Sequence, residues 1–285
     1  MVPSEARHGP YVEKLGAALG WIRTIISFQT CWLPRRIREL ITVVMSAKVI
    51  TMNTQSVRFK AFEFNNQHLQ YDIFMGLSGK GLSSDDRIAA GFVTPELAAI
   101  NEPTDSRLGV ALSHFSLWVE ILKTGSGMLI MEDDVMTHPA IWSQVERIPD
   151  LDQKDMILFS CNMDSTMAVI SPEGVGSICT FEPQNPHPDW IQSALAKTDI
   201  QKIRYNKIRR AFGLCCYYVT PKGAKKLVEN LFPLRTDSIF VPHLPHLVMQ
   251  AGLDRRLNAL YDELDAFITT PFLAYTPHEN EFAPR

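Results

Sequence analysis

The residues of this chain that are best suited to chemistry are three consecutive carboxylates at 132–134. They follow the apolar run 128–131, which indicates a strand covered on both faces of a parallel sheet. Ligands of open α/β sheets bind at the carboxyl ends of the strands. Adjacent carboxylates repel one another there unless a cation neutralises them, and Mg²⁺ and Mn²⁺ bind one or two protein carboxylates together with phosphate oxygens and water. The cluster therefore predicts a Mn²⁺ or Mg²⁺ site that serves a phosphate-containing substrate.

The three carboxylates are expected to point to two different faces of the strand. Alternate residues of an extended strand point to the same face, so we expect Glu132 and Asp134 to lie together and Asp133 to point away. Glu132 and Asp134 would then hold a metal-bound diphosphate, which the cation makes a good leaving group. Phosphatases and nucleases use similar clusters. A solvated loop, or the acidic first turn of a helix, would also place these residues together without any chemistry.

Strands and helices alternate along the chain around the cluster. Short apolar runs predict strands at 47–52, 71–75, 128–131, 155–160 and 215–219. Apolar spacing and capping residues predict helices over 56–66, from Ser106 to a stop at Gly125, from Pro221 after an N-cap at Thr220, and near 244–252. Residues 80–105 suggest a long loop or cover, and 165–210 show no strong period. The alternation predicts an α/β sandwich with a mostly parallel sheet.

Composition narrows the class of partner and the compartment. The net charge is −3, and no block of lysines and arginines is interleaved with aromatic residues, which argues against nucleic acid as a partner. The five cysteines include one adjacent pair and no CxxC spacing. This pattern argues against a disulfide framework or a zinc site and favours a reducing compartment, so we expect a cytoplasmic protein.

Residues 1–44 differ from the rest and are predicted to form an extension ahead of a domain over 45–285. Residues 15–33 are about as long as a membrane span but carry Arg23 near the centre, which costs roughly 2.5–3.5 kcal/mol in a bilayer. An apolar stripe with basic flanks predicts an amphipathic helix that packs on the core or contacts a membrane surface peripherally through 15–38. A signal anchor, or a stretch upstream of the working chain, is the alternative.

Three segments resemble glycosyltransferase family 25, which includes lipopolysaccharide and collagen sugar transferases. Residues 109–118, Gly-Val-Ala-Leu-Ser-His-Phe-Ser-Leu-Trp, are similar to the family's Gly-x-x-x-Ser-His-x-x-x-Trp. Leu-Ile-Met-Glu-Asp-Asp-Val follows at 129–135, and 215–227 is similar to the family's strand–turn–helix ending in Gly-Ala-Lys-Lys. The resemblance covers about 47–275. It implies a GT-A-like α/β/α sandwich (the nucleotide-diphospho-sugar transferase fold), a UDP-sugar donor, a divalent cation and inversion at the anomeric carbon.

The resemblance also implies site residues. Carried over residue by residue, it places Ser113, His114 and Asp133 beside the donor, together with the two metal-binding carboxylates. Arg58, which follows the first strand, is expected to pair with phosphate. Inversion by direct displacement requires a general base near the acceptor hydroxyl. Asp237, in a Leu-Arg-Thr-Asp segment similar to the family's Pro-x-Asp, is the candidate for that base or for an acceptor contact. A packing role for His114 and a surface role for Arg58 are the alternatives.

Two segments depart from the family pattern where the nucleotide would bind. The family's opening strand ends Asn-Leu-Asp-Arg, whereas 51–54 read Thr-Met-Asn-Thr; its Val-Asp-Gly after the second strand is Leu-Ser-Gly at 77–79. The resemblance implies transfer of a hexose, galactose or glucose, from a UDP-sugar to a glycan or glycolipid hydroxyl. The departures favour one alternative, a non-catalytic relative retained as a binding or assembly protein. A metal-dependent phosphoesterase is a second alternative.

Overall fold

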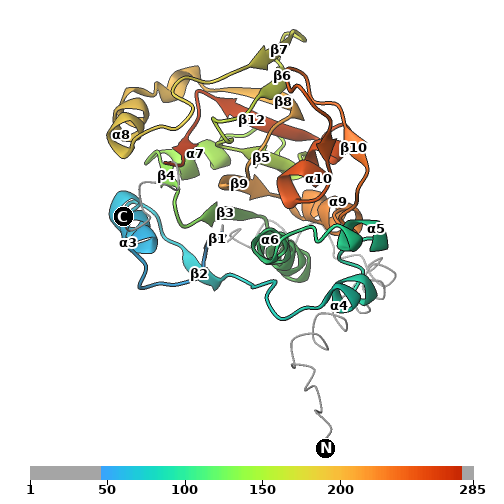
Figure 1. Ribbon diagram of the computed structural model, residues 1–285. Helices are drawn as coiled ribbons and strands as arrows, with labels where there is room; N and C mark the ends of the chain where they lie inside the picture. The colour runs from blue at the N-terminus through green and yellow to red at the C-terminus, as the bar shows by residue number, and fades with distance from the viewer. Residues whose placement is uncertain (1–45, 278–285) are drawn as a thin grey trace, which may run out of the picture.

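A nine-stranded mixed sheet forms the centre of the structure, a computed structural model that describes residues 46–277 (Figure 1). The strand order is β2-β1-β3-β9-β5-β12-β8-β6-β7. The strands are β1 (Ser46–Thr51), β2 (Asp72–Met75), β3 (Met128–Glu132), β5 (Met156–Leu158), β6 (Met167–Ile170), β7 (Gly176–Cys179), β8 (Arg204–Arg210), β9 (Cys216–Val219) and β12 (Ala266–Thr270). Strands β1, β2, β3, β5, β6 and β12 run in one direction, and β7, β8 and β9 run in the other. The predicted α/β class and mainly unidirectional sheet are therefore confirmed. The predicted extension at 1–44, with its membrane contact, lies outside the described residues.

Strand β9 is an important departure from a parallel sheet. It lies between β3 and β5 and is antiparallel to both. Its first residues therefore lie beside the carboxyl end of β3, with Cys216 opposite Met131. The Glu132 N–H donates to the Cys215 carbonyl at 2.8 Å. This insertion brings the start of β9 to the edge of the sheet where the carboxylate cluster begins.

Helices cover both faces of the sheet. They are α3 (Val57–Asn65), α4 (Ser84–Ala89), α5 (Pro95–Ala99), α6 (Asp105–Thr124), α7 (Ile141–Glu146), α8 (Pro188–Lys197), α9 (Pro221–Asn230) and α10 (Leu253–Leu260), with 3₁₀ turns at Leu151–Gln153 and Ile200–Lys202. Alternate residues of β3 pack on opposite sides. Met128 and Ile130 join a core with α6, α9 and α10, whereas Leu129 and Met131 join a core with α3 and α7. An apolar core on each face is what an α/β/α sandwich requires. None of the helices within 46–277 has the length and apolar character needed to cross a bilayer.

Caps fix the helices that flank the cluster. The Ser56 hydroxyl accepts the Phe59 N–H at 3.0 Å and so sets the start of α3. Helix α6 ends at Gly125, whose φ of 69° is the left-handed conformation that glycine adopts without strain. The Thr220 hydroxyl accepts the Gly223 N–H at 3.0 Å at the start of α9. The stop at Gly125 and the N-cap at Thr220 were predicted, and both are confirmed.

The helix predicted near 244–252 is wrong. A two-stranded antiparallel hairpin, β10 (Ser238–Ile239) with β11 (Val248–Met249), takes its place, and α10 begins only at Leu253. Pro242 and Pro245 favour this outcome, because a proline disfavours the helical conformation of the residue before it, here Val241 and Leu244. A second small sheet pairs β4 (Met136–Thr137) with β13 (Ala274–Tyr275).

Two stretches without a sequence period contain regular structure. Residues 80–105 hold the short helices α4 and α5, each preceded by a capping side chain, Ser83 and Thr94. Residues 165–210 hold β6, β7, α8 and β8. Strand β8 pairs with β12 and with β6, and these contacts join segments far apart in the sequence, which local patterns do not predict.

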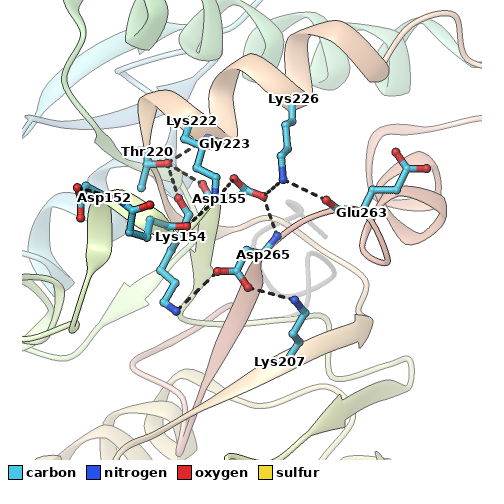
Figure 2. A network of polar contacts seen from close by, with 11 residues as sticks. Asp152, Lys154, Asp155, Lys207, Thr220, Lys222, Gly223, Lys226, Glu263 and Asp265 are labelled. Atoms are coloured by element: carbon cyan, nitrogen blue, oxygen red, sulfur yellow. Dashed lines mark hydrogen bonds and ion pairs between the residues drawn. The ribbon is translucent and has the colours of Figure 1, made fainter.

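A network of ion pairs and hydrogen bonds lies around Asp155, at the amino end of β5 (Figure 2). The carboxylate cluster lies at the other end of the sheet, after the carboxyl end of β3. Asp155, at the start of β5, is fully buried and accepts from Lys226 Nζ at 2.6 Å and from the Asp265 N–H at 2.7 Å. Asp265 in turn lies 3.1 Å from Lys207 Nζ. A Cβ on Gly223 would overlap the Asp155 carbonyl oxygen. The network joins β5, α9, β8 and β12, so its role is to fix the positions of these elements.

Candidate active site

The carboxylate cluster begins with the last residue of β3 and continues into a turn. Asp133 and Asp134 are in turn conformation, and the Val135 N–H donates to the Glu132 carbonyl at 3.3 Å. The backbone is therefore no longer extended beyond Glu132, and the strict alternation expected of a strand does not apply. This is why one side chain from a neighbouring element reaches both aspartates.

Arg58 is that side chain. It lies in the first turn of α3, with Nε at 2.5 Å from Asp133 Oδ1 and a terminal nitrogen at 3.0 Å from Asp134 Oδ2. Asp133 also accepts the Thr51 hydroxyl at 2.5 Å. The parallel pairing of β1 with β3, with Ile50 opposite Glu132, places Thr51 beside Asp133. The structure thus places Arg58 on the carboxylates, and Asp133 is engaged by protein groups.

Asp134 is the least satisfied member of the cluster. Its side chain is 9% exposed, and its Oδ1 atom is buried with no hydrogen-bond partner among the described residues. Burial raises the pKa of Asp134 to about 7; the Arg58 charge opposes this rise, and the charges of Glu132 and Asp133 add to it. A buried acceptor without a donor is costly unless a ligand satisfies it. Asp134 therefore keeps one buried oxygen whose hydrogen-bonding capacity the described residues leave unmet.

Glu132 is held from the other side. Its Oε1 atom lies 3.4 Å from His114 Nε2, and its side chain is 29% exposed, whereas His114 is buried. Burial alone would raise the pKa of Glu132, but the interaction with His114 and the Arg58 charge outweigh it and lower that pKa. Glu132 therefore remains an anion that is partly open to solvent.

Ser113 lies on α6 next to His114 and has a different function. Its hydroxyl donates to the Gly109 carbonyl at 2.8 Å and accepts the Leu77 N–H at 2.8 Å. The bond to Leu77 fixes the loop that follows β2. Gly109 is needed for the same approach, because a Cβ there would meet the Leu77 carbonyl. Ser113 therefore fixes the position of the loop after β2, which borders the site.

Two cavities meet at Glu132. The β1–β2 cavity, of about 530 Å³, is lined by Thr51, Arg58, Ser78, Ser113, His114 and Asp133 among others. The β9–α10 cavity, of about 390 Å³, is lined by Asp134, Asn162, Asp164, Leu214 and Asp254 among others. Glu132 lines both. The predicted donor residues Arg58, Ser113, His114 and Asp133 are thus brought together on one side of Glu132, and Asp134 on the other.

Asp237 is not brought to this site. Its carboxylate lies 3.8 Å from Arg235, is 70% exposed, and lines neither of the two cavities. Sequence reasoning missed Asp254, in the first turn of α10, which lines the β9–α10 cavity. Burial raises the pKa of Asp254, against hydrogen bonds from the Arg255 and Gly213 backbone and the Arg255 charge. An acidic residue in the first turn of an amphipathic helix was the signal that could have indicated it.

The residues present fit a divalent cation. No group of three histidine, cysteine, aspartate or glutamate side chains within 46–277 forms a closed metal site. Mg²⁺ and Mn²⁺ bound to a diphosphate need only one or two carboxylates, however, and phosphate oxygens and water complete the shell. Glu132 and Asp134 line the same cavity, and the described residues leave Asp134 Oδ1 without a hydrogen bond, which suits that requirement.

Comparison with known proteins identifies the family. No curated protein matches the chain in sequence. Among solved structures, the crystal structure of A197 from STIV aligns over 82% of this chain and 86% of its own, at 9% identity and a TM-score of 0.37, too low a score to support an argument. The family model described as glycosyltransferase family 25 (LPS biosynthesis protein) matches residues 47–240. Because this match spans most of the chain and includes the cluster, Ser113 and His114, the protein belongs to glycosyltransferase family 25.

Proposed function

We propose that the protein transfers a hexose, galactose or glucose, from a UDP-sugar to a glycan or glycolipid hydroxyl, with inversion and with a divalent cation at Glu132 and Asp134. The observation that supports this most directly is the position of Glu132 at the junction of the two cavities. A transferase must hold donor and acceptor side by side, with the leaving group between them. The family's description as an LPS biosynthesis protein supports a glycolipid acceptor.

The charge balance of the site supports the metal. Among the described residues, the ion pairs of the three carboxylates at 132–134 involve one permanently charged side chain, Arg58, together with His114. A diphosphate brought to a net negative site is repelled unless a further cation accompanies it. When bound, Mg²⁺ or Mn²⁺ would stabilise the charge of the departing diphosphate. Glu132 and Asp134 would hold the cation, and Arg58 would keep Asp133 neutralised.

The β1–β2 cavity suits the nucleotide. It lies at the carboxyl ends of two parallel strands, where open α/β sheets bind ligands, and Arg58 is partly exposed there. The departures at 51–54 and 77–79 line the same cavity through Thr51, Asn53 and Ser78. Of these, Asn53 and Ser78 place an amide and a hydroxyl, which suit hydrogen bonds to a ribose or uracil, where the family has aspartates.

The β9–α10 cavity suits the acceptor, and Asp254 is the residue there that we assign as general base in place of Asp237. Its carboxylate faces the cavity that Glu132 and Asp134 also line. The raised pKa brings the carboxyl closer to neutral pH, where a base removes a hydroxyl proton most effectively. Arg255, the next residue, donates its backbone N–H to Asp254 Oδ1 at 2.8 Å and so orients the carboxylate.

The test is a transfer assay on the full chain. UDP-galactose and UDP-glucose are supplied with Mn²⁺, with Mg²⁺ or with EDTA, and UDP release and sugar transfer to lipopolysaccharide-type acceptors are measured. We expect metal-dependent UDP release that rises when an acceptor is present. If calorimetry detects no binding of UDP in the presence of Mn²⁺ by the folded protein, the enzyme assignment fails.

One observation favours a second candidate, a non-catalytic binding protein. Arg58 and the Thr51 hydroxyl already satisfy Asp133, and Arg58 also pairs with one oxygen of Asp134, so the protein provides part of the neutralisation that a metal would otherwise supply. This candidate predicts that UDP or a UDP-sugar binds without turnover. The same titration and assay therefore separate the two functions.

A further inference from the structure

A chain of polar contacts runs from the core of the protein to Glu132. The Trp118 indole Nε1–H donates to the Tyr217 hydroxyl at 3.1 Å. That hydroxyl lies 2.6 Å from His114 Nδ1, and His114 Nε2 lies 3.4 Å from Glu132 Oε1. Trp118, Tyr217 and His114 are at most 1% exposed. The chain therefore connects three buried side chains to the one partly exposed carboxylate that lines both cavities.

Two elements are needed to build this chain. His114 and Trp118 lie one turn apart on the same face of α6, as residues at i and i+4 do. Tyr217 lies on β9, which pairs antiparallel with β3 so that Tyr217 is opposite Ile130. Glu132 follows two residues later on the same face of β3. The antiparallel insertion of β9 is thus what brings a phenol between the two α6 side chains.

The donors and acceptors around the Tyr217 hydroxyl indicate which ring nitrogen of His114 carries a hydrogen. Trp118 Nε1 can only donate, so the Tyr217 oxygen accepts from it. If His114 Nδ1 were protonated, it would also donate to Tyr217, and the phenol proton would have no acceptor among the described residues. If Nδ1 is unprotonated, Tyr217 donates to it and every group is paired. Burial also raises the pKa of Tyr217, partly offset by the Trp118 hydrogen bond, so the phenol keeps its proton.

We propose that Tyr217 and Trp118 are positioning residues that fix His114 as the neutral Nε2–H tautomer, so that its imidazole donates to Glu132 and holds this carboxylate at the junction of the two cavities. The importance of Glu132 rests on the proposed function; the hydrogen-bond chain does not. A neutral donor orients Glu132 without cancelling its charge, which stays available to a cation. Groups that orient a metal-binding carboxylate affect activity without touching the substrate.

The direct test is nitrogen NMR of the full chain labelled with ¹⁵N-histidine. The sequence has eight histidines, so a His114→Asn variant identifies the signals of His114. We expect a protonated Nε2, and an Nδ1 shifted upfield because it accepts a hydrogen bond. An Nδ1–H tautomer, or a ring protonated on both nitrogens at neutral pH, would overturn the proposal. In the Tyr217→Phe variant the Nδ1 signal should move downfield, since its donor is lost; an unchanged signal would also overturn it.

Kinetics test the consequence for Glu132. In Tyr217→Phe we expect kcat to fall roughly ten- to hundredfold with little change in KM for the UDP-sugar, because the binding groups remain while the carboxylate is less well oriented. Tyr218→Phe is the matched control: Tyr218 is the next residue of β9, is buried on the opposite face against Gly127, and lies outside the chain. Equal losses in both variants would refute a positioning role. The NMR result stands whether or not sugar transfer is observed, so failure of the proposed function and failure of this inference are distinguishable.

Discussion

Replacing Asp134 with asparagine should make the metal-free protein more stable while abolishing sugar transfer. Asp134 has one oxygen paired with Arg58 at 3.0 Å and one buried oxygen without a partner. Burial raises the pKa of this carboxyl from its usual 3.8 to about 7. The folded protein therefore binds this proton more tightly than the unfolded chain does, and the asparagine amide resembles the protonated form in shape and charge. A residue that costs stability at a site of ligand binding is expected to contribute to function.

The magnitude and its pH dependence follow from that pKa. Each tenfold change in proton affinity corresponds to 1.36 kcal/mol, so the rise from 3.8 to about 7 corresponds to roughly 4 kcal/mol as an upper bound. A carboxyl whose pKa is higher in the folded state binds its proton more tightly there, so its penalty is absent below pH 3.8, develops as pH rises, and is complete above pH 7. Since Asp134→Asn also loses the ion pair with Arg58, we expect a net gain of about 2 kcal/mol at pH 8, or about 4–8 °C in Tm.

Urea and thermal unfolding of the full chain in EDTA, at pH 8 and near pH 4, measure this difference directly. Asp134→Asn should exceed the wild type at pH 8, and the two should converge near pH 4. Asp72→Asn, at an exposed position of β2, is the control and should change stability little at either pH. Added Mn²⁺ should raise the Tm of the wild type more than that of the variant, because binding to the folded state stabilises it. If Asp134→Asn is no more stable than the wild type at pH 8 without metal, the reasoning from burial is wrong.

Three further substitutions test other parts of the structure. Arg58→Met should lower the free energy of unfolding by about 2–3 kcal/mol in urea titrations, because it leaves Asp133 and Asp134 without their cation; Arg107→Met, which removes an exposed pair with Glu102, should cost under about 1 kcal/mol. Gly223→Ala should cost about 1–3 kcal/mol in the same assay, since its Cβ would overlap the Asp155 carbonyl, whereas Gly176→Ala meets nothing within 4 Å and should be neutral. Asp254→Asn should lower kcat by roughly 10²–10⁴-fold in the transfer assay with Mn²⁺-dependent UDP binding retained; full activity would exclude Asp254 as the base.

The sequence predicted the site best where local patterns and fold rules agree. An apolar run that ends in carboxylates, a capped helix before it and a strand–turn–helix after it gave β3, α6 and β9 with α9. These three units supply Glu132, His114 and the backbone beside the cluster. Local patterns could not indicate that β9 runs antiparallel between β3 and β5, because buried strands of either direction are uniformly apolar. Tyr217 therefore gained its role only from the topology.

Local sequence patterns also did not indicate which acidic residue lies close enough to the cluster to act as the base. Asp237 follows α9 at the position where a functional acid was expected. The β10–β11 hairpin then intervenes, and its antiparallel pairing leaves Asp237 exposed at the hairpin's base. After the hairpin, the chain lines the β9–α10 cavity at residues 252–255, which include Asp254. Because this short hairpin separates α9 from α10, spacing after α9 alone could not indicate Asp254, the residue that we propose as the base.

Three adjacent carboxylates can lie in one site because different side chains pair with different members of the cluster. Arg58 from α3 engages Asp133 and one oxygen of Asp134, and His114 from α6 orients Glu132 from the opposite side. Both groups come from helices that begin or run at the carboxyl ends of β1 and β3, so the sheet order itself places them. What they leave unengaged is the exposed part of Glu132 and the buried Oδ1 atom of Asp134, and both residues line the β9–α10 cavity. The protein thus balances part of the charge internally and directs the remaining negative charge to the point where a cation, a diphosphate and an acceptor would meet.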